Sequence, residues 1–178
     1  LGEIEYASSA VVLSGHAFAD CGDPMEAFGL VIPHRERRNI LAVSYASRKL
    51  PGRAPAGRIL LRTFVGGGLQ PELATLGDRH IRALVRSELA AIYGITAKPD
   101  FMLVARHERA MPQYHVGHLA RLERIWQRLS THPRLALCGN AYHGVGIPDC
   151  IHSSELAAER AAAKVPRREA RRSGEVRP

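Results

Sequence analysis

The stretch of the chain with the clearest chemical potential is LALCGNAYHGVGIPDCI, residues 135–151. Its pattern predicts a short apolar strand over 135–137, a glycine-rich turn, and a helix that begins at Pro148 and runs to about residue 163. The first turn of a helix carries unpaired N–H groups and the positive end of the helix dipole. A turn that leads into a helix in this way suits an electron-rich or anionic group.

Three glycines decide how closely a ligand could approach this turn. Gly139 follows the predicted strand at its carboxyl end, where open α/β sheets bind ligands. Gly144 and Gly146 leave the backbone accessible, and the amides around Val145, Gly146 and Ile147 open the helix. The residues alone leave two interpretations, a ligand site and an ordinary strand–turn–helix connection.

Other residues with catalytic or metal-binding potential lack the partners that such chemistry requires. His115 and His118 could be a metal pair, but no third ligand lies at a suitable spacing, so we expect no metal site. Ser14 and His16 are not set in the Gly-x-Ser-x-Gly pattern of a nucleophile elbow. The three glycines at 66–68 are not followed by a helix pattern, which favours a turn or bulge over a phosphate cradle. No catalytic acid, base or nucleophile is identified.

Composition indicates a globular protein whose basic charge is concentrated at one end. Of 178 residues, 46% are hydrophobic and 24% charged, with a net charge of +8. Residues 160–178 hold seven basic and two acidic residues, so most of that charge lies in a segment too polar to pack. We expect a solvated tail over 164–178 rather than a nucleic-acid site; weak attraction to an anionic membrane surface is the alternative. The three cysteines form no Cys-x-x-Cys pair.

The spacing of apolar residues predicts strands joined by short turns, followed by helices. Short connections favour antiparallel over parallel pairing of these strands. Gly94 is well placed to end the first long helix. Strands are expected over 9–14, 28–33, 39–45, 58–65 and 101–105, and helices over 78–93 and 118–129 in addition to 148–163.

Several separated segments resemble, in order, the C-terminal part of the protoporphyrinogen oxidases of the flavin amine-oxidase superfamily. The two most specific are MPQYHVGH at 111–118 and GNAYHGVGIPDC at 139–150. FGLVIP at 28–33, LPGRAP at 50–55 and VGG at 65–67 add weaker support. The resemblance covers residue 1 to about residue 163.

The resemblance implies a fold that combines α+β and α/β parts. Residues 1–110 would belong to a substrate-binding domain with a mixed, largely antiparallel sheet and helices. Residues 111–163 would return to a Rossmann-like FAD-binding domain and supply its last strand and helix. The Gly-x-Gly-x-x-Gly fingerprint of that domain's N-terminal part is absent from the sequence. We therefore expect part of a longer enzyme or an incomplete gene product, inactive by itself.

The resemblance also implies residues for two binding sites. The cofactor-binding residues would be the matching tripeptide Val145, Gly146 and Ile147, together with Gly139 and Asn140. The residues that line the macrocycle pocket would be Phe28, Gly29, Val31 and Phe64. An apolar, aromatic lining suits a flat macrocycle, although a place in the protein core is an equal alternative for Phe28.

The activity implied is the oxidation of protoporphyrinogen or coproporphyrinogen to the porphyrin in haem synthesis. FAD would accept hydride equivalents at N5 in three two-electron rounds, and O2 would reoxidise it. Amides and the positive helix end beside the flavin N1–C2=O edge would stabilise the negative charge of the reduced ring. Substrate propionates would need cationic partners, for which Arg48, Lys49 and Arg53 qualify by charge.

Two alternative functions stay open at this point. One is another flavin enzyme, of the amine oxidase or phytoene desaturase type. The other is a non-catalytic remnant or a basic binding module. For a porphyrinogen oxidase, the partners expected are a porphyrinogen and O2, without nucleic acid, and the expected location is the cytoplasm. Peripheral association with the inner face of the cell membrane and a homodimer also stay open.

Overall fold

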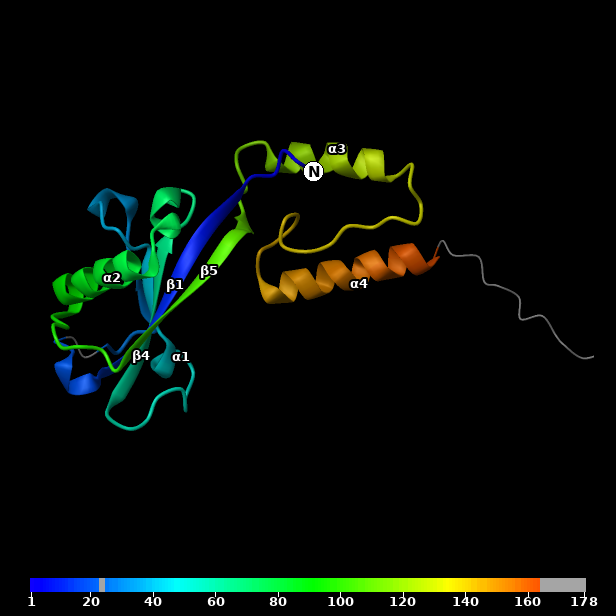
Figure 1. The fold of residues 1–178 in the computed structure, drawn as a ribbon. Helices are drawn as coiled ribbons and strands as arrows, with labels where there is room; N and C mark the ends of the chain where they lie inside the picture. Colours follow the sequence, from blue (N-terminus) through cyan, green and yellow to red (C-terminus); the bar gives the residue numbers. More distant parts are fainter. Residues whose placement is uncertain (23–24, 164–178) are drawn as a thin grey trace, which may run out of the picture. The chain divides into compact units, whose positions relative to one another are not determined.

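The computed structural model describes residues 1–22 and 25–163 and contains two compact units (Figure 1). The sheet unit comprises Glu5–Gln113, and the helical unit comprises Leu1–Ile4 together with the described residues from Tyr114 to Ala163. The chain thus passes between units after Gln113, whereas the resemblance placed a boundary after residue 110. Which ligand each unit binds stays a prediction. The basic tail expected over 164–178 lies outside the described residues.

The sheet unit is built on five strands in the spatial order β2-β3-β4-β1-β5. The central strand β1, Tyr6–Ala17, pairs with β4, Arg58–Gly66, on one side and with β5, Phe101–Pro112, on the other. The short strands β2, Gly29–Val31, and β3, Ala42–Tyr45, complete the sheet beyond β4. Antiparallel pairing is confirmed, and the expectation of a mixed sheet is wrong, because every pairing among the described residues is antiparallel.

One long helix covers a face of this sheet. Helix α2, Asp78–Tyr93, has the predicted bounds, and it ends at Gly94, whose φ of +69° is the left-handed conformation that glycine adopts easily. Its residues Ile81, Val85 and Leu89 recur every fourth position and are buried. The short helical elements of the unit are η1 Phe18–Asp20, η2 His34–Glu36, α1 Ala46–Lys49 and η3 Pro71–Thr75.

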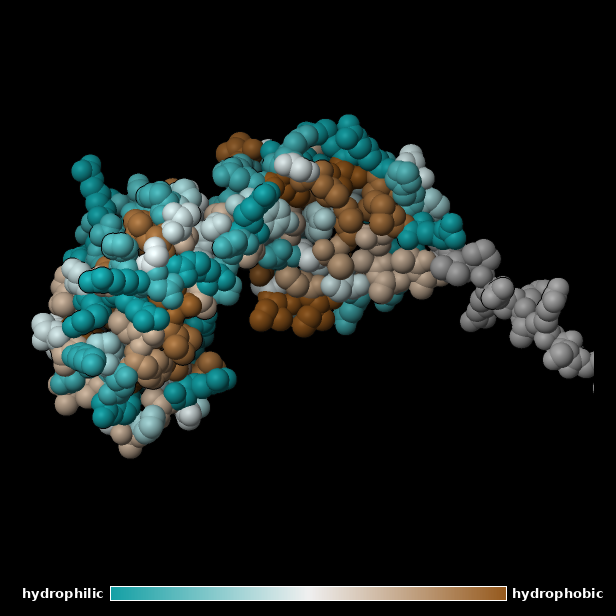
Figure 2. Space-filling view, viewed as in Figure 1, coloured by the Kyte–Doolittle hydropathy of each residue, from teal (hydrophilic) through white to brown (hydrophobic). Residues whose placement is uncertain are grey.

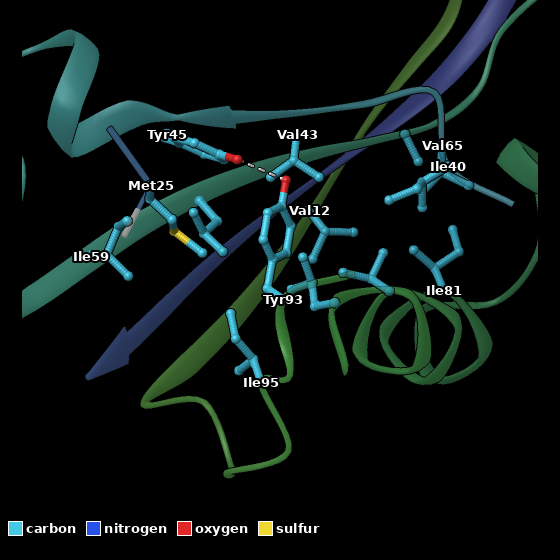
Figure 3. Packing of buried hydrophobic residues seen from close by; sticks show 14 residues of the cluster. Val12, Met25, Ile40, Val43, Tyr45, Ile59, Val65, Ile81, Tyr93 and Ile95 are labelled. Carbon is cyan, nitrogen blue, oxygen red and sulfur yellow. Dashed lines mark hydrogen bonds between the residues drawn. The ribbon is translucent and has the colours of Figure 1, made fainter. Parts of the chain in front are cut away.

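The core of the sheet unit lies between α2 and alternate residues of the strands. Val12 of β1 and Leu61 of the adjacent β4 are completely buried there. At one end of this core the Tyr45 hydroxyl donates to the Tyr93 hydroxyl at 3.0 Å, and the two rings meet edge to face (Figure 3). Because each hydroxyl has a partner, both rings can be buried without an unpaired polar atom.

A buried carboxylate connects α2 to the loop before β3. Glu88 is 7% exposed, and it accepts hydrogen bonds from Nη1 of Arg38 at 2.9 Å and from the backbone N–H of Asn39 at 3.0 Å. The ionised group is therefore paired as well as hydrogen-bonded, which offsets the cost of removing it from water.

A second buried polar pair lies on β1, where Nε2 of His16 is 2.9 Å from Oγ of Ser14. Both residues point to the α2 side of the sheet and are buried. Burial lowers the pKa of His16 below its ordinary value of 6.5, while Asp100 and Asp20 oppose the shift. Both side chains are almost inaccessible to solvent, so their hydrogen bond belongs to the core of the unit.

The helical unit contains the two remaining predicted helices, α3, His118–Leu129, and α4, Ile147–Ala163. The N-terminal segment is attached to α3 through Glu3. Its carboxylate accepts hydrogen bonds from Nε of Arg121 at 3.4 Å and Nη2 of Arg124 at 3.2 Å. The hydrogen bond from Arg121 and the charge of Arg124 lower the pKa of Glu3.

The predicted strand over 135–137 is wrong for this structure. The segment is irregular, and Leu135 is 55% exposed. A strand requires a neighbour for its N–H and C=O groups, and within the described ranges no strand lies beside this segment. Residues 135–137 are therefore apolar, as in a strand, but they lack a neighbouring strand with which to form hydrogen bonds.

Candidate functional site

The glycine-rich turn before α4 is held by two side chains from the segment that leads into α3. The Tyr114 hydroxyl donates to the backbone carbonyl of Asn140 at 2.6 Å. Nε2 of His118 lies 3.1 Å from the backbone carbonyl oxygen of Tyr142. The rings of Tyr114 and His118 stack with their centroids 4.1 Å apart. Two sequence motifs that are separated by a whole helix therefore meet in one place.

The contact at Tyr142 determines which nitrogen of His118 carries a proton. A carbonyl oxygen only accepts hydrogen bonds, so Nε2 is the donor. Nδ1 is buried and has no hydrogen-bond partner among the described residues. Between residues 1–22 and 25–163, no group of three or more histidine, cysteine, aspartate or glutamate side chains could hold a metal ion. The histidine that could be considered a metal ligand serves to support the turn.

Aromatic side chains extend this support along α3. The ring of Trp126 lies 5.5 Å from that of Tyr142 and 5.8 Å from that of His143, and it is nearly parallel to the His143 ring. Such ring pairs add stabilisation beyond the area that they bury. The turn thus rests on an aromatic wall, which the helical period of α3 alone could not reveal.

Gly139 has a conformational reason to be glycine. Its φ is +112°, a conformation that other residues rarely adopt, and its N–H donates to Oγ of Ser153 in α4 at 3.2 Å. The Ser153 hydroxyl in turn donates to the Cys150 carbonyl at 3.0 Å. Gly139 and Asn140, both predicted to bind the cofactor, therefore have structural partners within the helical unit.

The two glycines closest to α4 leave space for a side chain of the protein itself. A Cβ atom added to Gly144 would lie 2.5 Å from the Asp149 carboxylate, and one added to Gly146 would lie 2.9 Å from it. The N–H of Gly146 donates to Oδ2 of Asp149 at 3.2 Å, and its carbonyl accepts the first helical hydrogen bond from Cys150. Asp149 thus caps the helix start. The expectation that all amides of the tripeptide are open is wrong for Gly146.

Val145 and Ile147, on either side of that glycine, remain available to a ligand. The two residues are 65% and 77% exposed, and no hydrogen bond among the described residues engages their backbone amides. Both amides lie at the positive end of a helix of 17 residues. An apolar ring with an electron-rich edge fits this donor set, and the isoalloxazine of FAD has that chemistry. The Asp149 carboxylate reduces the positive potential beside them.

Three of the four predicted substrate residues share one face of the sheet in the other unit. Residues that are paired across neighbouring strands form a row on the sheet. Val31 of β2 and Phe64 of β4 belong to one such row, and Gly29 belongs to the next row on the same face. This face is opposite the one that α2 covers, because side chains alternate along a strand. Phe28 precedes β2 and lies outside these rows, but its side chain is exposed, so a core position is wrong for it.

Gly29 also has a structural reason to be glycine. A Cβ atom there would lie 2.5 Å from the carbonyl oxygen of Val43, so a side chain would force the two strands apart. Among the cations considered for propionate binding, Arg48 lies over the Phe18 ring, with its guanidinium carbon 5.2 Å from the ring centroid, while Lys49 and Arg53 are exposed in the segment between β3 and β4. Arg62 was not among the cations considered from the sequence, although two-residue alternation along 58–65 places it on the same face as Phe64.

The helical unit also carries an apolar hollow of about 520 Å3 between α3 and α4. Figure 2 shows hydrophobic side chains gathered between these two helices. Leu135 and Leu137, from the segment predicted as a strand, belong to its lining. The remaining lining residues are Trp126, Leu129, Ala136, Tyr142, His143, Ser153, Leu156, Ala157 and Arg160.

The comparison with known families agrees with the motifs that meet at the turn. The model of the flavin containing amine oxidoreductases matches residues 27–162. The chain belongs to this family. The matched region begins after β1 and includes strands β2 to β5 and the turn before α4.

Curated relatives within this family are porphyrinogen oxidases. A coproporphyrinogen III oxidase of Staphylococcus aureus is 33% identical over 138 residues, which cover 77% of the chain and 30% of the relative. A human protoporphyrinogen oxidase is 31% identical over 143 residues, 76% of the chain and 30% of the relative. A solved structure from Exiguobacterium sp. 255-15, provisionally assigned as a protoporphyrinogen oxidase, matches with a TM-score of 0.76 and 27% identity over 92% of the chain and 36% of its own.

The chain therefore spans about a third or less of the length of these relatives. Both kinds of porphyrinogen oxidase match the chain at similar identity, which does not distinguish the two substrates. None of the helices within residues 1–22 and 25–163 has both the length and the apolar character needed to cross a bilayer.

Proposed function

We propose that this chain forms part of an FAD-dependent porphyrinogen oxidase that converts protoporphyrinogen or coproporphyrinogen to the porphyrin with O2 as acceptor. In this proposal the helical unit contacts the flavin ring and the sheet unit contacts the tetrapyrrole. The chain alone would retain too few FAD contacts for turnover, because its sequence has no Gly-x-Gly-x-x-Gly segment for the pyrophosphate.

The observation that carries the proposal is the way the turn is held. Tyr114 and His118 fix the backbone of Asn140 and Tyr142 through two hydrogen bonds, and this positions the exposed Val145 at the start of α4. A helix start that is held in place from outside the helix is a preorganised set of donors. An exposed apolar residue beside free amides also matches a ring that is flat, apolar and polar at one edge.

When bound, FAD would take electron pairs from the substrate and pass them to O2. The chain's own residues would act on charge and position. The amides of Val145 and Ile147 would donate hydrogen bonds to the electron-rich edge of the ring, and the helix dipole would favour negative charge there. Asp149 would limit that effect, because its carboxylate lies at the same helix end.

On the sheet unit, the exposed face would receive the macrocycle. Val31 and Phe64 lie in one row of side chains across the strands, and Phe101 shields Gly15 of the central strand two rows away. Such a surface is broad, apolar and nearly continuous, which suits a flat tetrapyrrole more than a small amine.

The test measures flavin binding and porphyrin formation in the complete polypeptide that carries this chain. We expect bound FAD, and porphyrin fluorescence that develops from coproporphyrinogen III or protoporphyrinogen IX in air and stops under argon. Gly146→Ala should lower flavin occupancy several-fold, because the new Cβ meets Asp149. Gly2→Ala is the matched control, since nothing lies within 4 Å of its added Cβ. A flavoprotein that oxidises amines but neither porphyrinogen would overturn the proposal.

A further inference from the structure

Two arginines lie on the exposed face of β4, and they differ in their partners. Arg58, at the strand's start, makes an ion pair with Asp100, with Nη1 3.1 Å from each carboxylate oxygen. Arg62, four residues later on the same face, lies over the Phe64 ring with its guanidinium carbon 5.3 Å from the ring centroid. It is exposed, and no carboxylate among the described residues pairs with it. Of the two arginines, Arg58 is neutralised by Asp100, and Arg62 is available to an anionic ligand.

The surroundings of Arg62 are apolar along the sheet. Its row across the five strands contains Gly29, Ser44, Leu13 and Leu103. The adjacent row on the same face consists of apolar residues in every strand, namely Val31, Ala42, Phe64, Val11 and Ala105. At about 4.8 Å between neighbouring strands, each row extends over roughly 19 Å. The face can therefore support a large flat ligand, and it carries its cation near the centre rather than at the rim.

We infer that Arg62 binds a propionate carboxylate of a tetrapyrrole that lies on this face. The inference rests on the proposed function and assigns a residue to its substrate. A ligand that covers an apolar face removes water from the guanidinium at its centre, and a charge that loses its water requires an ionic partner. Guanidinium groups bind carboxylates through two parallel hydrogen bonds, whereas an uncharged apolar ligand would leave Arg62 unpaired. The hydroxyl of Ser44, in the same row, is placed to assist.

The test uses the oxidised product as a stable probe. Coproporphyrin III and its tetramethyl ester have the same ring and differ in charge, and their binding to the complete polypeptide that carries this chain is measured by fluorescence titration. We expect Arg62→Gln to raise the Kd of the acid about tenfold and to leave the Kd of the ester unchanged. Arg62→Lys should retain part of the affinity. Arg58→Gln, on the same face of the same strand, should change the Kd of the acid less than twofold because Asp100 already neutralises that arginine.

Each outcome decides between the inference and the function on which it rests. If the complete polypeptide binds the acid and the Arg62→Gln substitution does not weaken that binding, the inference is overturned and the proposed function stands. If Arg62→Gln weakens acid and ester equally, the arginine contributes by packing, and the inference is again overturned. If the complete unaltered polypeptide binds neither porphyrin, the sheet face is not a tetrapyrrole surface and both proposals fail. Far-UV circular dichroism of each variant confirms that the fold is retained.

Discussion

The two units use their apolar residues differently. In the sheet unit, strands and α2 bury each other's side chains, so that Leu61 and Ile81 are inaccessible to solvent. In the helical unit, hydrogen bonds and ring stacking position a turn, while Val145, Ile147 and Ile151 remain exposed. Exposed apolar groups of this kind mark surfaces that meet a ligand or another protein segment. Both units expose apolar residues, but the sheet unit also has a large buried core, whereas polar contacts and ring stacking position the exposed turn of the helical unit.

The largest effect should follow from removing core volume in the sheet unit. Leu61→Ala should lower its free energy of unfolding by about 3 kcal/mol, because the completely buried side chain leaves a cavity. Urea denaturation followed by circular dichroism measures the change. The matched variant Leu156→Ala in the helical unit, whose leucine is 40% exposed, should cost less than about 1 kcal/mol. Equal costs would contradict the difference between the units.

The next effect concerns the buried carboxylate of the sheet unit. Glu88→Ala leaves Arg38 and the Asn39 amide without their acceptor, and we expect a loss of about 2 kcal/mol. The value is below that of a fully buried pair because the Arg38 side chain is 36% exposed. Asp100→Ala, which breaks the exposed pair with Arg58, should change stability by no more than about 0.5 kcal/mol. A larger loss of stability in Asp100→Ala would show that solvent exposure does not determine which of the two ion pairs contributes more.

A smaller, local effect should appear in the helical unit. Tyr114→Phe removes only the hydroxyl that donates to Asn140, so the turn should loosen by about 1 kcal/mol. Amide hydrogen exchange should become roughly fivefold faster over 140–143 while the strands of the other unit are unchanged. Tyr6→Phe is the control, since the Tyr6 hydroxyl has no hydrogen-bond partner among the described residues. Unchanged exchange in the turn would remove the support assigned to Tyr114.

The smallest effect is a pH dependence confined to the sheet unit. The pKa of His16 is lowered by burial, so the unfolded state binds a proton more readily than the folded state. The contribution of His16 to stability is complete above its pKa in the unfolded state, near 6.5. It is lost as the pH falls through that value toward the pKa in the folded state. The urea midpoint should therefore decline between pH 7.5 and pH 5.5, and less so in His16→Gln. Parallel curves for the two proteins would contradict this assignment.

The predictable parts of the fold are those in which local pattern and tertiary contact agree. The period of apolar residues correctly predicted α2 and α3, and Gly94 ended α2 in the expected conformation. Strand β5 was predicted only over 101–105, because its remaining length is mostly exposed and polar, yet pairing with β1 extends it to Pro112. The segment 135–137 failed for the opposite reason, since it has the apolar pattern and no neighbouring strand.

The candidate site shows the same limit at the level of single residues. The sequence indicated that Gly144, Gly146 and the helix start belong together. It could not indicate that the Asp149 carboxylate fills the space beside the glycines, because that contact depends on the path of the turn. Arg62 was likewise within reach of two-residue alternation, but its lack of a carboxylate partner emerges only when the neighbouring strands are in place.

The sequence by itself determined the family, most helices and strands, and the turn that leads into α4, because these depend on local patterns and on motifs that are read residue by residue. The tertiary structure decided how Tyr114 and His118 hold that turn, and which arginine of β4 remains unpaired. Hydrogen bonds, ring stacking and ion pairs between distant segments depend on distances that only the folded chain establishes. For this reason the sequence located the candidate site, and the structure showed which contacts each of its residues makes.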